Sequence, residues 1–114
     1  MLLLVPTFMS LVTACGTEEA VKAFNNEPVA TITSHSDGAT IQEGYVVTFT
    51  GQVSDANHAQ NTLETIWSTE QREICPKTFA DATGQTSCQA ILQEGEGELK
   101  LQVVDPEGAA SGMT

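Results

Sequence analysis

The stretch Tyr45-Val46-Val47-Thr48-Phe49-Thr50-Gly51-Gln52-Val53 alternates apolar and polar side chains. Four apolar side chains fall on one face of an extended chain: Tyr45, Val47, Phe49 and Val53. Three polar side chains fall on the other, with Val46 as an exception: Thr48, Thr50 and Gln52. A period of two residues is typical of a β-strand with one buried face. This stretch therefore predicts a strand at the centre of a β-sheet protein.

Shorter segments of the same kind lie on both sides, separated by turn clusters rich in Gly, Asp, Asn and Ser. We expect extended chain at residues 29–33, 39–42, 63–68, 88–92, 99–104 and 109–114. Within them, six side chains are expected to point inward: Leu63, Thr65, Trp67, Leu99, Leu101 and Val103. Residues 69–86 form a long irregular connection. About seven short strands with one Trp on the third main strand predict an all-β, Greek-key β-sandwich.

Several motifs in this region carry a more specific resemblance. Glu43-Gly44 leads into the strand that ends at Asp55, and Leu99–Val103 is followed by Asp105-Pro106-Glu107-Gly108. With these motifs, residues 28–114 resemble bacterial Ig-like domains related to the PKD repeat. The resemblance implies an Ig-like fold. The family pattern continues with a full final strand, so residues 109–114 are expected to be a truncated one, and the chain a fragment of a longer protein.

The N-terminal segment predicts export. Met1 to Ala14 carry no charge, and this apolar run is shorter than the ~20 residues that span a bilayer. It matches the hydrophobic region of a secretory signal peptide, although it begins without Lys or Arg. Val12-Thr13-Ala14-Cys15 closely resembles the lipobox of bacterial lipoproteins. The alternatives are a signal peptide without lipidation and a buried N-terminal strand.

The lipobox resemblance implies cleavage before Cys15, acylation of Cys15 and a place in the bacterial cell envelope. Gly16, where an Asp tends to retain lipoproteins at the inner membrane, favours the outer membrane and cell surface. We expect residues 1–14 to be the signal peptide. Residues 15–27 would then form the lipidated Cys and a flexible tether, and residues 28–114 the sandwich.

The remaining two cysteines are expected to form a disulfide. The chain has three cysteines, and lipidation of Cys15 leaves Cys75 and Cys88 as an even pair in an exported protein. A bond between them would close a loop and stabilise a small domain by about 3 kcal/mol. The alternative is a metal site, but two cysteines with no His nearby make a poor zinc pattern.

Composition excludes one class of partner. Four Lys and Arg stand against 15 Asp and Glu, which gives a net charge of −11. Nucleic-acid binding needs a basic surface, so DNA and RNA are excluded as main partners. The same charge disfavours adsorption to anionic lipid headgroups, which leaves the acyl group as the expected membrane contact.

The candidate catalytic motifs have simpler explanations. Ser34, His35 and Asp37 are too close in sequence to converge as a nucleophilic triad. Glu94, Glu96 and Glu98 alternate with glycines and are expected to form a solvated acidic hairpin, and His58 is expected to be solvated in its loop. We therefore expect no enzymatic activity.

One metal site is worth considering. Asp55 and Asp105 end two strands that are usual neighbours, so their carboxylates can approach each other and hold calcium. The simpler explanation is that each side chain stabilises its own turn. The sequence thus predicts a lipid-anchored, non-catalytic module with a structural or adhesive role. The alternatives are a module that binds calcium or carbohydrate at the cell surface, and an accessory domain of a larger secreted protein.

Overall fold

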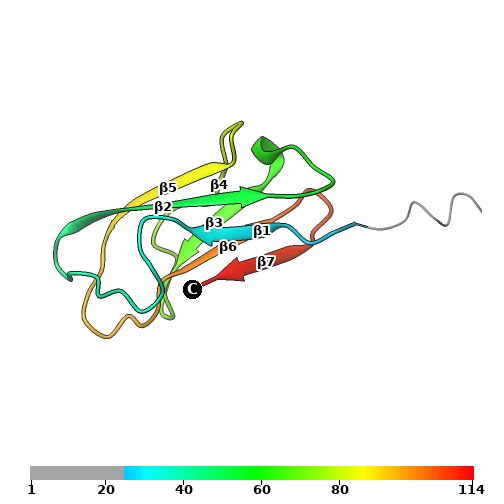
Figure 1. Cartoon of the computed structure of the whole chain (residues 1–114). Helices are drawn as coiled ribbons and strands as arrows, with labels where there is room; N and C mark the ends of the chain where they lie inside the picture. Colours follow the sequence, from blue (N-terminus) through cyan, green and yellow to red (C-terminus); the bar gives the residue numbers. More distant parts are fainter. Residues whose placement is uncertain (1–24) are drawn as a thin grey trace, which may run out of the picture.

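Seven β-strands form two antiparallel sheets in the computed structural model, which describes residues 25–114 (Figure 1). The first sheet holds, in spatial order, β1 (Val29–Ile32), β2 (Val46–Ser54) and β5 (Gln85–Ile91). The second holds β4 (Thr78–Phe79), β3 (Glu64–Ser68), β6 (Lys100–Val104) and β7 (Ala110–Met113). The predicted signal peptide, Cys15 and most of the predicted tether lie outside the described residues.

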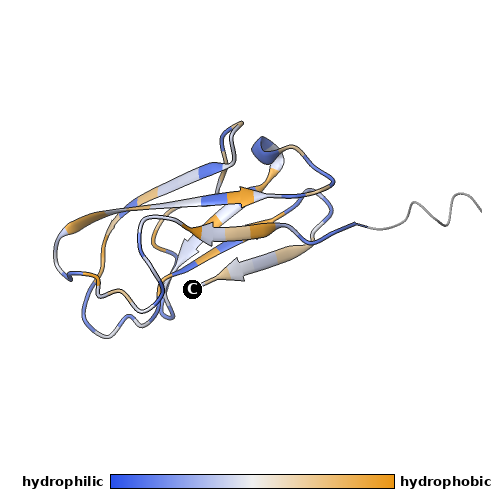
Figure 2. Cartoon of the chain, viewed as in Figure 1, coloured by the Kyte–Doolittle hydropathy of each residue, from blue (hydrophilic) through white to orange (hydrophobic). Residues whose placement is uncertain are grey.

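The chain crosses between the sheets three times along its length, after β2, after β4 and after β5. The buried apolar side chains of both sheets meet between them and form one core. Figure 2 shows hydrophobic and hydrophilic residues alternating along the strands. The all-β sandwich expected from the sequence is therefore confirmed. Within residues 25–114, no helix has the length and apolar character needed to cross a membrane.

Trp67 on β3 is the largest side chain of the core, and it is 1% exposed. Its ring stacks on Phe49 of the opposite sheet, with ring centroids 6.1 Å apart. Its Nε1 donates a hydrogen bond to Thr86 Oγ1, also in the opposite sheet, at 3.1 Å. Gly51 makes room for this arrangement, because a Cβ there would lie 2.5 Å from Leu101 Cδ2 and 3.3 Å from the Trp67 ring.

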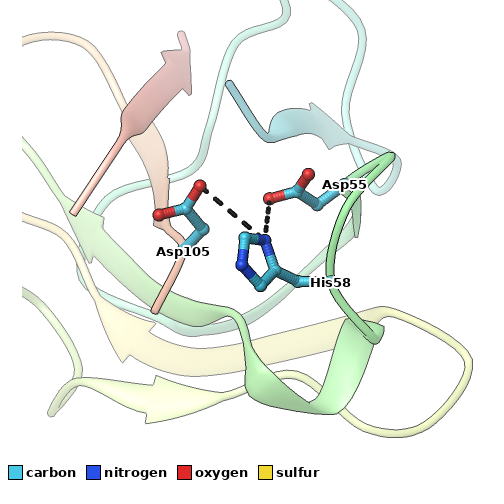
Figure 3. A group of neighbouring side chains, drawn as sticks. All are labelled: Asp55, His58 and Asp105. Carbon is cyan, nitrogen blue, oxygen red and sulfur yellow. Dashed lines mark hydrogen bonds and ion pairs between the residues drawn. The ribbon is translucent and has the colours of Figure 1, made fainter. Parts of the chain in front are cut away.

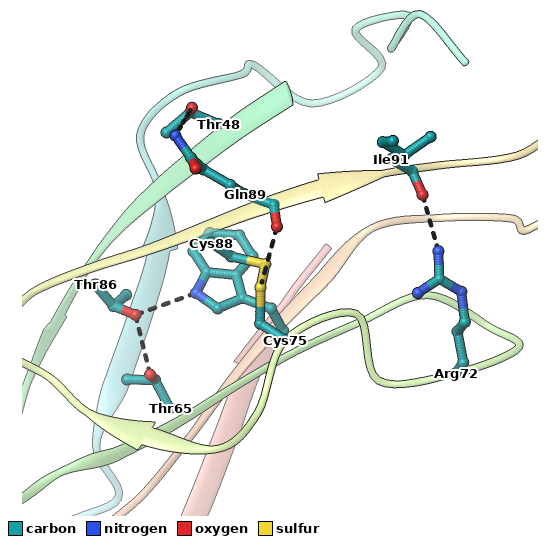
Figure 4. Close-up of a disulfide and its surroundings, with 9 residues drawn as sticks. Thr48, Thr65, Arg72, Cys75, Thr86, Cys88, Gln89 and Ile91 are labelled. Carbon is teal, nitrogen blue, oxygen red and sulfur yellow. Dashed lines mark hydrogen bonds between the residues drawn. A yellow bond between two sulfur atoms is a disulfide. The ribbon is translucent and has the colours of Figure 1, made fainter. Parts of the chain in front are cut away.

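The Cys75–Cys88 disulfide ties the connection after β3 to β5 in the other sheet (Figure 4). Beside it, Thr65 and Thr86 share a buried hydrogen bond, at 2.9 Å between their hydroxyl oxygens. A covalent link and hydrogen bonds thus join the two sheets around one part of the core. The predicted disulfide is confirmed.

The predicted strands are mostly confirmed, with three corrections. Residues 69–86 are not wholly irregular, because β4 forms in them by pairing Glu64 with Phe79. Two residues are too few to show a period, so only this pairing reveals β4. Residues 39–42 form no strand, and residues 85–87 lengthen β5 beyond the expected start. Tyr45 is 63% exposed, because it precedes β2 at the end of the sandwich.

The disulfide yields a stability prediction. Replacing both cysteines by alanine (C75A/C88A) should lower the free energy of unfolding by about 2–3 kcal/mol, because the unfolded chain loses a loop constraint. The two cysteines are 13 residues apart. Urea unfolding of the full chain measures the change. Reductant should shift the urea midpoint of the parent to that of the double variant, and it should leave the midpoint of the double variant unchanged. Equal midpoints for parent and variant would contradict the prediction.

Candidate functional site

One end of the sandwich gathers three ionisable side chains from two connections (Figure 3). Asp55 follows β2 and His58 lies in the connection to β3, just before the short 3-10 turn η2 (Gln60–Thr62). Asp105 follows β6. One ligand atom from each of the three lies within 4.8 Å of the others. The sequence prediction that Asp55 and Asp105 can approach each other therefore matches the geometry.

Asp105 organises the connection between β6 and β7. Its Oδ1 accepts hydrogen bonds from the backbone N–H groups of Glu107 and Ala109, both at 2.9 Å, and its Oδ2 accepts one from Asn25 Nδ2 at 2.9 Å. Burial by itself would raise the pKa of this carboxyl, but these hydrogen bonds hold the pKa of Asp105 below its usual value. The carboxylate thus stays charged although its side chain is fully covered.

His58 sits between carboxylates and is not solvated as the sequence suggested. Its side chain is 16% exposed, with Nδ1 at 3.0 Å from Asp55 Oδ2 and Nε2 at 2.9 Å from Glu107 Oε2. The hydrogen bond to Asp55 is the main cause that raises the pKa of His58, and burial acts against it. Both ring nitrogens face carboxylate oxygens, which is the arrangement that a protonated imidazole satisfies. No local motif indicates this arrangement, because Glu107 and Asp105 lie far along the chain from His58.

The start of the described chain is fixed to this same end. Besides the bond from Asn25 to Asp105, the Asn26 N–H donates to Asn57 Oδ1 at 2.8 Å. The sequence placed Asn25 and Asn26 in a flexible tether, whereas the structure holds both against the sandwich. The Asn25 Oδ1 atom is buried and has no hydrogen-bond partner among residues 25–114. A buried acceptor without a donor is uncommon, since the cost of leaving it unpaired is about 1–3 kcal/mol.

The turn explanation for the two aspartates also holds. Asp55 Oδ1 accepts a hydrogen bond from the Asn57 N–H at 2.9 Å, and the Gly108 N–H donates to the backbone oxygen of Asp105 at 3.0 Å. Two carboxylates and an amide oxygen suit a hard cation such as calcium, which takes 6–8 oxygen ligands. The imidazole of His58 does not suit calcium, and suits a metal such as zinc only when it is deprotonated.

A second polar cluster lies at the opposite end of the sandwich. Arg72 donates from Nε to Glu96 Oε2 at 2.8 Å and from Nη2 to Glu96 Oε1 at 3.1 Å. Its Nη2 also donates to the backbone oxygen of Ile91 at 2.9 Å (Figure 4). The expected hairpin is wrong, because β5 and β6 lie in different sheets and this segment connects them. The expected solvent exposure is correct for Glu94 and Glu98 and wrong for Glu96, which is 5% exposed.

His35 packs as a structural residue. Its ring lies 5.4 Å from Phe49 between centroids, and its Nδ1 is 2.8 Å from Ser34 Oγ. Ser34 Oγ also accepts a hydrogen bond from the Thr50 N–H at 3.0 Å, and among residues 25–114 no hydrogen bond or ion pair joins the His35 ring to Asp37. Of the expected site residues, the structure brings Asp55 and Asp105 together. Cys15, the expected lipidation site, lies outside the described residues.

The chain matches no protein-family model, and comparisons with curated proteins and with solved structures found no match. Functional inference therefore rests on the residues and contacts of this chain.

The Arg72–Glu96 pair yields a pH prediction. The hydrogen bond from Arg72 is the main cause that lowers the pKa of Glu96 below its usual value. Below about pH 5 the unfolded chain therefore takes up this proton before the folded chain does, and stability falls as pH falls through the folded pKa. In Glu96→Gln this part of the pH dependence should disappear, although the variant is less stable at neutral pH.

Urea unfolding between about pH 6 and pH 3 measures the slope. Glu94→Gln is the matched control, because Glu94 is exposed and has no ion pair among residues 25–114, and it should retain the parent slope. An unchanged slope in Glu96→Gln would show that this pair does not couple stability to pH.

Proposed function

We propose that this chain is an exported, lipid-anchored module in which an Ig-like, PKD-like sandwich serves a non-catalytic structural or adhesive role at the bacterial cell envelope. The observation that carries the proposal is the Cys75–Cys88 disulfide. Structural disulfides persist in oxidising compartments outside the cytosol, which agrees with export. The same bond leaves Cys15 as the third cysteine, directly after the small residues Thr13 and Ala14.

The strand arrangement supports the Ig-like part of the proposal. Immunoglobulin constant domains place their first, second and fifth strands in one sheet and their third, sixth and seventh in the other. Residues 25–114 share this division, and the buried Trp67 on the third strand agrees with it. The fourth strand differs, because β4 pairs with β3 instead of joining the first sheet.

A lipid anchor would supply the membrane attachment that the acidic surface of this chain does not provide. With a net charge of −11, the protein is repelled by anionic headgroups, so stable membrane attachment needs two or three acyl chains. The described chain starts at the end of the sandwich that holds Asp105, so the anchored domain would present its opposite end away from the bilayer (Figure 1). Such an orientation suits a spacer or a module that binds protein or carbohydrate.

The test is Cys15→Ser in the full chain produced in a bacterium. The parent should remain with membranes after washes with high salt and alkaline carbonate, and its mature N-terminal peptide should carry acyl groups by mass spectrometry. The variant should lose both properties. The control C75A/C88A should stay membrane-bound, because it removes the disulfide and keeps the lipidation cysteine. An unmodified thiol on Cys15 of the mature parent would refute the anchor.

A second candidate is cation binding at Asp55 and Asp105. The buried Asn25 Oδ1, which has no hydrogen-bond partner in the part of the chain that the structure describes, favours it. The amide nitrogen of Asn25 contacts Asp105, so rotation of the amide would turn its oxygen toward the carboxylates. Two carboxylates and an amide oxygen would hold a divalent cation, and His58 would have to release its contact with Asp55 or lose its proton.

Thermal unfolding of the full chain with calcium or zinc tests this candidate. A ligand that binds only the folded state must raise the melting temperature, by an amount that grows with its concentration. Asp55→Asn should remove most of the increase, and the control Asp81→Asn should retain it because Asp81 lies in another turn. No increase with either metal, in the parent treated first with chelator, would refute cation binding.

A further inference from the structure

We propose that a groove at the end of the sandwich away from Asp105 binds a basic peptide segment, in which lysine or arginine stands beside aliphatic residues. The groove lies between the β1–β2 connection (33–45) and the β5–β6 connection (92–99), and its volume is about 680 Å³. This volume is within the range of about 300–1,000 Å³ that is usual for ligand sites. The inference does not depend on the lipid anchor.

The groove has an apolar floor. Ile32, Leu92 and Leu99 belong to the core and reach the groove lining with 6–8% of their surface exposed. Ile41, from the β1–β2 connection, is half-buried and packs against the same core. Aliphatic groups of a ligand would therefore meet aliphatic side chains, and removing this apolar surface from water favours binding.

The rim of the groove is acidic on both sides. Asp37 and Glu43 come from the β1–β2 connection, and Glu94 and Glu98 from the β5–β6 connection. All four residues are exposed, and within residues 25–114 none of them forms an ion pair. The groove lining in that part of the chain contains no Lys or Arg. A rim of uncompensated carboxylates is complementary to a cationic ligand and raises its rate of association.

Glu96 differs from the rim carboxylates, because its charge is compensated within the fold. It lines the groove too, but Arg72 binds both of its oxygens and the Gln93 N–H donates to Oε1 at 2.8 Å. The fold thus compensates the buried carboxylate, whereas its neighbours Glu94 and Glu98 form no ion pair with any residue that the structure describes. The free charges are available to a partner, whereas Glu96 serves stability.

The rim fits an extended ligand better than a single metal ion. Within residues 25–114, the group of three metal-ligating side chains whose atoms converge is Asp55, His58 and Asp105, at the opposite end. The groove carboxylates come from two separate connections, so they suit charges spaced along a chain. A peptide that alternates lysine with aliphatic residues provides both spaced cations for the rim and side chains for the floor.

Isothermal titration calorimetry of the full chain tests the proposal with a short capped peptide that alternates lysine with leucine. Binding should be measurable at low salt and should weaken when sodium chloride is raised from about 0.05 M to about 0.5 M, which shortens the screening length. A peptide that alternates glutamate with leucine should not bind. One that alternates lysine with serine should bind about tenfold more weakly, because it leaves the floor uncovered.

A triple variant removes three of the four rim charges and keeps Glu98: Asp37→Asn, Glu43→Gln and Glu94→Gln. We expect it to bind the lysine–leucine peptide about tenfold more weakly than the parent, because three carboxylates that could pair with lysine are lost. The matched control changes three acidic residues outside the groove lining and therefore makes the net charge less negative by the same three charges: Glu27→Gln, Glu64→Gln and Glu73→Gln. The control should retain the parent affinity, and thermal unfolding of all three proteins checks that each is folded.

Three outcomes would overturn the proposal. The first is no binding of the lysine–leucine peptide by the folded parent. The second is an equal loss of affinity in the two triple variants, which would assign the effect to overall charge. The third is equally tight binding of spermine, a linear polyamine without side chains, which would assign the groove to small cations and not to a peptide.

Discussion

Packing between the two sheets at Trp67 is the constraint on which this domain depends. The indole stacks on Phe49, hydrogen-bonds to Thr86 and passes close to Gly51, so one side chain of the second sheet touches three residues of the first. The disulfide closes beside it, from Cys75 to Cys88. Aromatic residues make up only 5% of the chain, so this cluster supplies much of the packing that a small aliphatic core lacks.

The sequence predicted features that depend on local pattern. The alternation in β2 and β6 indicated the buried faces, and the even pair of cysteines that remains beside Cys15 predicted the disulfide. The proximity of Asp55 and Asp105 followed from the expected neighbourhood of their strands. Features that depend on distant residues were missed. Glu96 was expected in solvent because its partner Arg72 lies 24 positions away, and His58 because Glu107 and Asp105 approach it only after folding.

The two ends of the sandwich differ in how their charges are compensated. At the end where the described chain starts, the carboxylates of Asp55 and Asp105 are covered and meet donors from His58, Asn25 and the backbone. At the opposite end, one carboxylate is neutralised by Arg72 and four remain exposed around an apolar floor. The first end is thus built to hold its own connections together, while the second leaves charge available for a partner.

The contact between Arg72 and the backbone of β5 has a consequence for self-association. In the described fold β5 pairs with β2 along one side, so its other side is a sheet edge, and β5 carries no charged residue. Such an edge can template the addition of a strand from another molecule. The guanidinium of Arg72 occupies the Ile91 oxygen, and the disulfide brings the β3–β4 connection against Cys88. Together they obstruct that edge, which helps keep neighbouring copies of the protein separate where the protein is concentrated.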